Sequence, residues 1–235
     1  MILKMSLKLG VNWKNILRWV MIVLVIGLIF GFFIRVAIWE DGYYREMEGS
    51  ERAESAETKI KDENEELDET VPTEEEVREY YVAWDRPRYL SIEKLGITNA
   101  RVLAVGINPG GELGTPNNIF EVGWYEASGK PGMGGTVLID GHNGGPNVYG
   151  VFKYLPYLEV GDIITIERGD GEVFKYSIME NVEVSLDEAD IYMATAMRSP
   201  ETGKESVTLI SCSGEWSNSR YTYLSRQFVR AVLVS

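Results

Sequence analysis

The sequence predicts a mainly β domain, a sandwich or a closed barrel, in the C-terminal part of the chain. From Tyr89 onward, short runs rich in β-branched residues alternate with clusters of Gly, Pro and Asn. This spacing is typical of sandwiches and barrels rather than of βαβ units, and closure would remove exposed strand edges. Gly169-Asp170-Gly171 is a typical hairpin turn between two such runs. An apolar N-terminal run and an acidic stretch further predict one transmembrane helix and an acidic stalk before this domain.

Composition narrows the class of protein. The chain has 235 residues, of which 45% are apolar, so it can form a buried core. Its net charge of −13 argues against nucleic acid as a partner, because phosphate binding needs a basic surface. Its single cysteine excludes an internal disulfide. The thiol therefore either packs in the buried core or takes part in a reaction.

The first 39 residues contain no acidic side chain. Residues 1–18 carry basic side chains, and residues 19–39 are an apolar run interrupted only by Arg35, which lies near one end and can reach the headgroups. This run of 21 residues matches the roughly 20 that cross a bilayer as a helix. A cleaved signal peptide is the alternative, but the cleavage pattern around Ala37 is poor. We therefore expect a cytoplasmic N-terminus at 1–18 and a transmembrane helix at 19–39.

Charge on the two sides of this helix predicts its orientation. Basic residues precede it and Glu40 and Asp41 follow it, so the positive-inside rule places the N-terminus in the cytoplasm. The expected protein is a single-pass protein of the cell membrane with everything from Glu40 outside. Residues 40–87 are predicted to be an acidic extracellular stalk, because such a composition buries too little apolar surface to order itself. The alternative is a functional stalk, which would bind cationic wall polymers or cover a site as a lid.

The remaining residues, 88–235, are predicted to form the folded domain. Two short helices are expected at 148–155 and 191–197. The expected strands are 89–92, 100–107, 136–139, 163–167, 172–184, 206–211 and 227–234.

Three chemically distinctive side chains adjoin expected strands. Cys212 follows the apolar run 207–211, the only histidine, His142, follows the run 136–139, and Arg226 stands at the entrance to 227–234. A thiol, an imidazole and a guanidinium at strand ends could form one site.

These segments resemble the sortases, membrane-bound cysteine transpeptidases of Gram-positive-type cell surfaces. Residues 208–212 read TLISC, which matches the family's TLxTC strand apart from Ser211 in place of the usual Thr. Residues 137–142 read VLIDGH and carry the upstream histidine, and the final strand begins with Arg226. The segment GWY at 123–125, followed by PG at 131–132, belongs to the same resemblance. The segments GWY and DGH, the latter at 140–142, look closest to class E and F sortases. The resemblance implies that the domain is a closed eight-stranded sortase-type β-barrel with short connecting helices.

The resemblance also implies the roles of the site residues. Cys212 would be the nucleophile, and His142 would protonate the leaving amine and later deprotonate the incoming one, since imidazole titrates near neutrality. Arg226 would stabilise the substrate carbonyl or the oxyanion with its N–H donors. Ser211 would either donate to the oxyanion or serve as an ordinary strand serine. Arg220 is the rival arginine.

Other features of the sequence give weaker evidence about function. Asp140 lies two residues before His142 and is read as structural rather than as part of a triad. Loops around Trp124 and Trp216 are expected to exclude water from the acyl intermediate. No cofactor is expected; calcium is possible, but no ligand spacing supports it. The carboxylates considered for calcium are Glu121, Glu126, Asp187 and Glu188.

The expected substrates are surface proteins that bear an LPxTG-like sorting signal, and the expected acceptor is an amine on a peptidoglycan precursor or a pilin. The alternative from another class is an inactive, membrane-tethered barrel that binds wall peptides or acts as a scaffold. Papain-like hydrolases place the cysteine before the histidine, and L,D-transpeptidases keep the two close together, so neither pattern fits.

Overall fold

The computed structural model describes residues 67–235. The predicted cytoplasmic segment, the predicted transmembrane helix and residues 40–66 of the predicted stalk lie outside the described residues. Among residues 67–235, no helix has the length and apolar character to cross a membrane.

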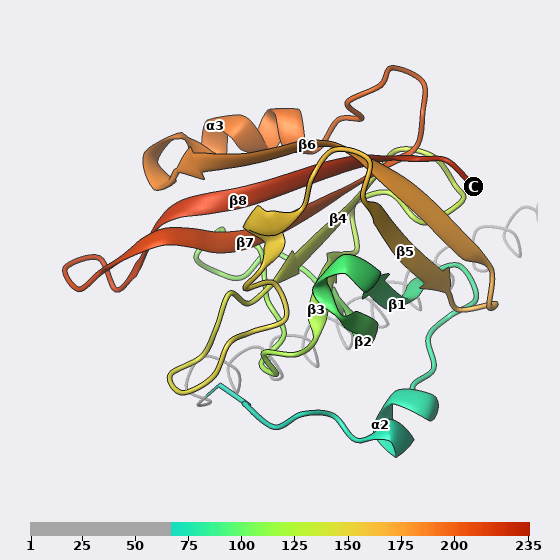
Figure 1. Cartoon of the computed structure of the whole chain (residues 1–235), viewed down its shortest axis with the longest axis horizontal. Helices are drawn as coiled ribbons and strands as arrows, with labels where there is room; N and C mark the ends of the chain where they lie inside the picture. The colour runs from blue at the N-terminus through green and yellow to red at the C-terminus, as the bar shows by residue number, and fades with distance from the viewer. Residues whose placement is uncertain (1–66) are drawn as a thin grey trace, which may run out of the picture. The chain divides into compact units, whose positions relative to one another are not determined.

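The described part of the chain folds around a closed β-barrel of eight strands, as the resemblance implied (Figure 1). The strands follow the order β1-β2-β3-β4-β7-β8-β6-β5, and the pairs β2–β3 and β4–β7 are parallel. The elements in chain order are α2 (Glu74–Arg78), β1 (Pro87–Ile92), η1 (Glu93–Leu95), β2 (Ile97–Val105), β3 (Val122–Tyr125), β4 (Thr136–Gly141), η2 (Leu155–Tyr157), β5 (Ile163–Arg168), β6 (Val173–Ser185), α3 (Leu186–Ala196), β7 (Ser206–Ser217) and β8 (Thr222–Leu233).

Every strand expected from the sequence is present, but β3 was missed. β3 is only four residues long and contains a glycine, so it lacks a clear alternating pattern. The helix expected at 148–155 is wrong: the chain forms turns there and then the 3₁₀ helix η2. The helix expected at 191–197 exists as α3 but begins five residues earlier, with Asp187 and Glu188 in its first turn, where carboxylates favour helix starts.

The barrel interior holds the main core. Alternate residues of each strand point inward, and those of β4 and β7 include Val137, Ile139, Val207 and Leu209, each with 0% exposure. Trp124 of β3 belongs to this core and donates from Nε1 to the Gly129 carbonyl at 3.0 Å. Trp124 itself therefore lies in the barrel core, and the exclusion of water by loops around Trp124 and Trp216 stays a prediction.

A second apolar cluster lies on the outer face of β4, β7 and β8. It is formed by the intervening residues Leu138, Ile210 and Phe228, which alternate with the inward ones. Helix α3 covers this cluster through Ala189 and Ala196, and Figure 1 shows the helix lying beside β6 and β8. The outer face of β4, β7 and β8 is thus partly covered by α3.

Candidate active site

Cys212 and Arg226 are directly opposite each other on the β7–β8 pair. Opposite residues of an antiparallel pair point to the same face with Cβ atoms about 5 Å apart. Cys212 lies two residues beyond Ile210, so it shares the outer face with the apolar cluster beneath α3. A β-bulge containing Gly214, with φ +76°, follows directly. A β-bulge bends its strand and changes the direction of nearby side chains, and bulges are common next to active sites.

His142 directly follows the end of strand β4, which pairs in parallel with β7. The last paired residues are Asp140 and Ile210, and His142 and Cys212 each lie two residues beyond this pair in their own segments. The His142 ring is half-buried, and its Nε2 lies 2.8 Å from the carbonyl oxygen of Pro116. A carbonyl can only accept a hydrogen bond, so Nε2 carries a proton. The other ring nitrogen, Nδ1, is the one left for acid–base chemistry.

Arg226 is anchored at one end of its guanidinium. Nη1 donates to the carbonyls of Tyr223 at 3.1 Å and Ser225 at 3.0 Å, and Nη2 donates to the Thr222 hydroxyl at 3.3 Å. Among residues 67–235 no acceptor engages Nε. The rival Arg220 instead forms an exposed ion pair with Asp187 at 2.8 Å. The structure therefore places Arg226, and not Arg220, opposite the thiol.

The environment of Cys212 keeps its thiol protonated at rest. Burial raises the pKa of Cys212, and the carboxylates of Asp140 and Glu112 raise it further, while the Arg226 guanidinium acts to lower it. Burial is the largest of these influences. Because the thiolate is the nucleophilic form, a nucleophilic reaction at Cys212 would first require removal of the thiol proton.

Asp140 points to the same face as Cys212, since its register partner is Ile210. Its Oδ2 accepts a hydrogen bond from the Thr115 hydroxyl, whereas the His142 ring bonds to the Pro116 carbonyl. Burial raises the pKa of Asp140, against the lowering effect of that hydroxyl and of His142 and Arg226. These contacts agree with a structural role for Asp140 rather than with a member of a triad.

Ser211 faces the other way. Its side chain is 1% exposed, and its hydroxyl donates to the Gly141 carbonyl at 2.8 Å. Neighbouring residues of a strand point to opposite faces, so this hydroxyl is directed away from the face that carries Cys212. The bond ties β7 to β4 next to His142. This geometry favours the reading of Ser211 as a structural strand serine over the reading as an oxyanion donor.

The segment between β2 and β3 contributes residues that sequence reasoning missed. It supplies the Pro116 carbonyl beside His142, the Thr115 hydroxyl on Asp140, and Glu112, which acts on the pKa of Cys212. The sequence around 108–111 predicts only a turn. A bond made by a backbone carbonyl leaves no side-chain pattern, so the role of Pro116 had no readable signal.

The four carboxylates considered for calcium do not gather. Glu121 pairs with Arg101, Asp187 pairs with Arg220, and the Glu188 carboxylate accepts the Ser185 hydroxyl. Within residues 67–235, no group of three or more His, Cys, Asp or Glu side chains comes together as a metal site.

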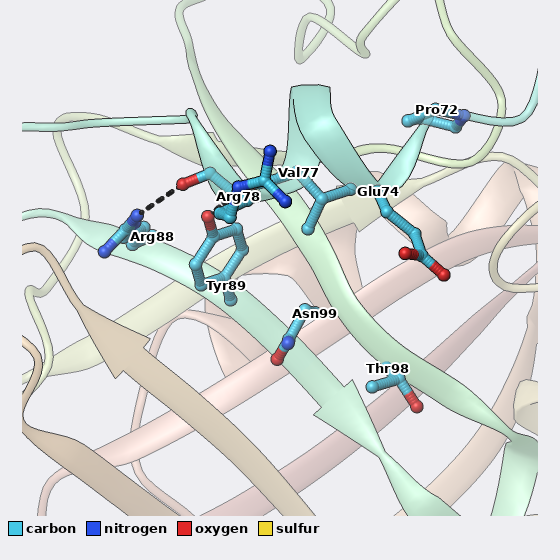
Figure 2. A pocket seen from close by; sticks show the side chains of 8 residues that line it. All are labelled: Pro72, Glu74, Val77, Arg78, Arg88, Tyr89, Thr98 and Asn99. Carbon is cyan, nitrogen blue, oxygen red and sulfur yellow. Dashed lines mark hydrogen bonds between the residues drawn. The ribbon is translucent and has the colours of Figure 1, made fainter.

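A pocket of about 560 Å³ lies elsewhere on the barrel, between α2 and the strands β1 and β2 (Figure 2). In the strand order, β3 and β4 separate these strands from β7. Tyr89 and Arg88 at this pocket bond to the carbonyls of Val77 and Arg78, which fixes α2 in place. Its lining residues are Pro72, Glu74, Val77, Arg78, Arg88, Tyr89, Thr98 and Asn99. The pocket is thus separate from Cys212.

An eight-stranded barrel that brings a thiol, an imidazole and a guanidinium to adjacent strands defines a candidate thiol enzyme. Residues 90–234 match the family model described as the sortase domain. This match covers more than half of the chain, and the chain therefore belongs to the sortase family. The family consists of cysteine transpeptidases.

Solved structures similar to this one are also sortases. One is a sortase D5 transpeptidase of Clostridium perfringens, 24% identical, covering 70% of this chain and 90% of that one with a TM-score of 0.45. A lid mutant of sortase C1 from Streptococcus agalactiae is 20% identical, with coverages of 70% and 76% and a TM-score of 0.47. The SrtA sortase of Actinomyces oris is 18% identical, with coverages of 65% and 82% and a TM-score of 0.46. No match was found among curated proteins.

Proposed function

We propose that the chain cleaves an LPxTG-like sorting signal through a thioester on Cys212 and transfers the acyl group to an amine. The observation that supports this proposal is the register that pairs Cys212 with Arg226, on a strand that also pairs with β4, the strand that His142 follows. The acceptor amine belongs to a peptidoglycan precursor or a pilin.

Acylation begins with attack of Cys212 Sγ on the carbonyl carbon of the Thr–Gly-type bond. The thiol proton passes to the His142 imidazole, the C–S bond forms, and the carbonyl oxygen takes the negative charge. The imidazolium then gives its proton to the departing nitrogen as the C–N bond breaks. His142 Nδ1 is the atom assigned to both transfers, because Nε2 is bound to the Pro116 carbonyl.

Deacylation runs the same steps with a new amine. The amine nitrogen attacks the thioester carbonyl carbon and loses a proton to His142, the C–S bond breaks, and the sulfur regains a proton. Arg226 stabilises the oxyanion in both half-reactions, since arginine remains charged and offers planar N–H donors. Its anchored Nη1 sets the guanidinium position before substrate binds.

We further propose that residues 19–39 anchor the protein in the cell membrane, with residues 1–18 in the cytoplasm and the barrel outside. The apolar run and the basic flank support this arrangement. Sorting-signal proteins and amine acceptors at the cell surface would then both reach the barrel.

Product analysis tests the activity. The protein is incubated with a peptide library varied around LPxTG and with glycine and lysine amines, and ligated products are read by mass. We expect Cys212→Ala to abolish cleavage and ligation, and Arg226→Ala to lower the rate by at least about a hundredfold. Arg220→Ala, the matched control, should retain activity. If Arg220→Ala is inactive and Arg226→Ala active, the arginine assignment is wrong, and ligation by Cys212→Ala would refute the thioester.

A further inference from the structure

Residues 68–70, within the predicted stalk, contact two segments that adjoin His142, and one of these contains Pro116. Asp68 forms an isolated parallel bridge with Asn118. The Asn118 amide, 8% exposed, donates to the Asp68 carboxylate at 2.9 Å and to the Thr70 carbonyl at 2.8 Å. Asn118 lies two residues after Pro116, whose carbonyl receives the His142 Nε2 proton. Asp68 and Thr70 therefore fix the segment that orients the imidazole.

Glu69 contacts the other segment. Its Oε1 accepts from the backbone N–H of Asn147 at 2.8 Å and of Val148 at 3.3 Å, and its Oε2 accepts from the Asn147 side-chain amide at 2.8 Å. These donors form the tip of residues 143–150, a tight hairpin that begins directly after His142. One carboxylate thus satisfies three donors at this tip.

The chain that returns from the 143–150 hairpin packs against the backbone of His142. Gly144 bridges Tyr149, and beyond the hairpin the Phe152 N–H donates to the His142 carbonyl at 2.9 Å. A Cβ added at Gly150 would lie 2.4 Å from that carbonyl oxygen, so the returning chain passes against the His142 backbone. A displacement of the hairpin would therefore move the histidine.

Gly145 leaves room for the Glu69 carboxylate at the hairpin tip. A Cβ built at Gly145 would lie 2.3 Å from Glu69 Oε1. The backbone of Gly145 is outside the left-handed region, so alanine can adopt it. A methyl group here would displace the carboxylate without removing its charge.

We propose that residues 68–70 act as a strap that positions His142, with Glu69 as a positioning residue for the acid–base step. This inference rests on the proposed transpeptidase function. The strap holds both the segment that orients the imidazole and the hairpin that follows the histidine backbone. Small errors in the position of a catalytic group cost up to about a hundredfold in rate, so the strap contributes to turnover without touching substrate.

Three variants of the full chain test the strap. Glu69→Ala removes the carboxylate, and Gly145→Ala displaces it while keeping its charge. Glu75→Ala is the control, since Glu75 is exposed in the first turn of α2 and its carboxylate makes no bond or ion pair within residues 67–235. We expect the two strap variants to lower kcat by about tenfold, with KM for the sorting peptide within about twofold of wild type. The control should match wild type.

The single histidine supplies a readout independent of activity. In ¹⁵N-detected spectra of the imidazole, we expect a protonated Nε2 in the wild type, and broadened or averaged ring signals in Glu69→Ala and Gly145→Ala but not in Glu75→Ala. Unchanged ring signals and kcat in both strap variants would overturn the inference. Changed ring signals in a protein that ligates no amine would leave the strap standing and refute the proposed function instead.

Discussion

Opposing influences on one thiol decide how Cys212 reacts. Burial is the largest and raises the pKa, Asp140 and Glu112 raise it further, and the guanidinium of Arg226 acts in the opposite direction. A resting thiol that stays protonated is protected from oxidants and alkylating agents, which react with the thiolate. In the proposed mechanism, reaction then depends on His142 taking the proton when substrate arrives.

Removing the charge opposite the thiol should make it less reactive. Because Arg226 lowers the pKa of Cys212, Arg226→Gln raises that pKa and decreases the thiolate fraction at neutral pH. We expect alkylation by iodoacetamide to slow severalfold near pH 8, with the midpoint of the rate profile shifted to higher pH. Arg220→Gln should leave the profile unchanged. A faster reaction in Arg226→Gln would contradict the assigned position of the guanidinium.

The three candidate side chains were predictable because each carries rare chemistry: the single cysteine, the single histidine and an arginine at a strand entrance. Their surroundings were less so. The Pro116 carbonyl is a backbone group, and the inward direction of Ser211 depends on register. One residue of register decides which face of a strand a side chain occupies.

At the scale of elements, the site depends on where β4 ends. The pairing of β4 with β7 ends at Asp140 and Ile210. Beyond Ile210, β7 is paired only with β8, so Cys212 lies just past the point where β7 loses one of its two neighbouring strands. The sequence had placed Cys212 directly after its strand, whereas β7 runs on to Ser217. The continuation was hidden because Gly214 and Glu215 interrupt the apolar pattern.

Acid should release the strap from the 143–150 hairpin. Hydrogen bonds from Asn147 hold the pKa of Glu69 below its ordinary value of 4.5, and bonds from Thr70 hold the pKa of Asp68 below 3.8. For groups whose pKa is lowered by folding, the stabilisation is fully present above the ordinary pKa and is lost as pH falls through the lowered one. The contact should therefore be fully present above the ordinary glutamate pKa of 4.5 and open only at a pH below it.

The amide resonances of Asn147 and Val148 measure this opening between about pH 3 and about pH 6. They should move together with a midpoint below the ordinary pKa of glutamate. In Glu69→Gln, which has no titrating carboxyl group at this position, the same movement should disappear. A midpoint at or above 4.5, or none at all, would show that the Glu69 carboxylate is not bonded as described.

At the scale of the whole molecule, the packed core and the candidate active site lie on opposite faces of the barrel wall. Its inner face is a packed apolar core, while the outer face of β4, β7 and β8 carries the apolar cluster under α3 and, beyond it, the thiol and guanidinium. Mainly β architecture followed from strand patterns, and closure into eight strands followed from the family resemblance. The strap was not predicted, since residues 68–70 lie in a strongly acidic stretch that resembles a solvated stalk.

The anchored arrangement predicts how the full chain fractionates. We expect it to sediment with membranes, to resist extraction by about 1 M salt, which screens surface charge, and to be released by detergent. A chain beginning at residue 64 should remain in the supernatant. Protease added outside intact protoplasts should digest the barrel. Release of the full chain by salt would contradict residues 19–39 as a membrane anchor, and protection of the barrel from protease would contradict its placement outside the cell.

The most direct test is the mass of the intact protein after incubation with a sorting-signal peptide and no amine acceptor. The chain should gain the mass of the peptide up to and including the threonine-type residue, on a fragment containing Cys212. The gain should disappear on adding hydroxylamine and should never form in Cys212→Ala. Peptide cleavage with no adduct on Cys212, or with an adduct on another residue, would contradict the thioester.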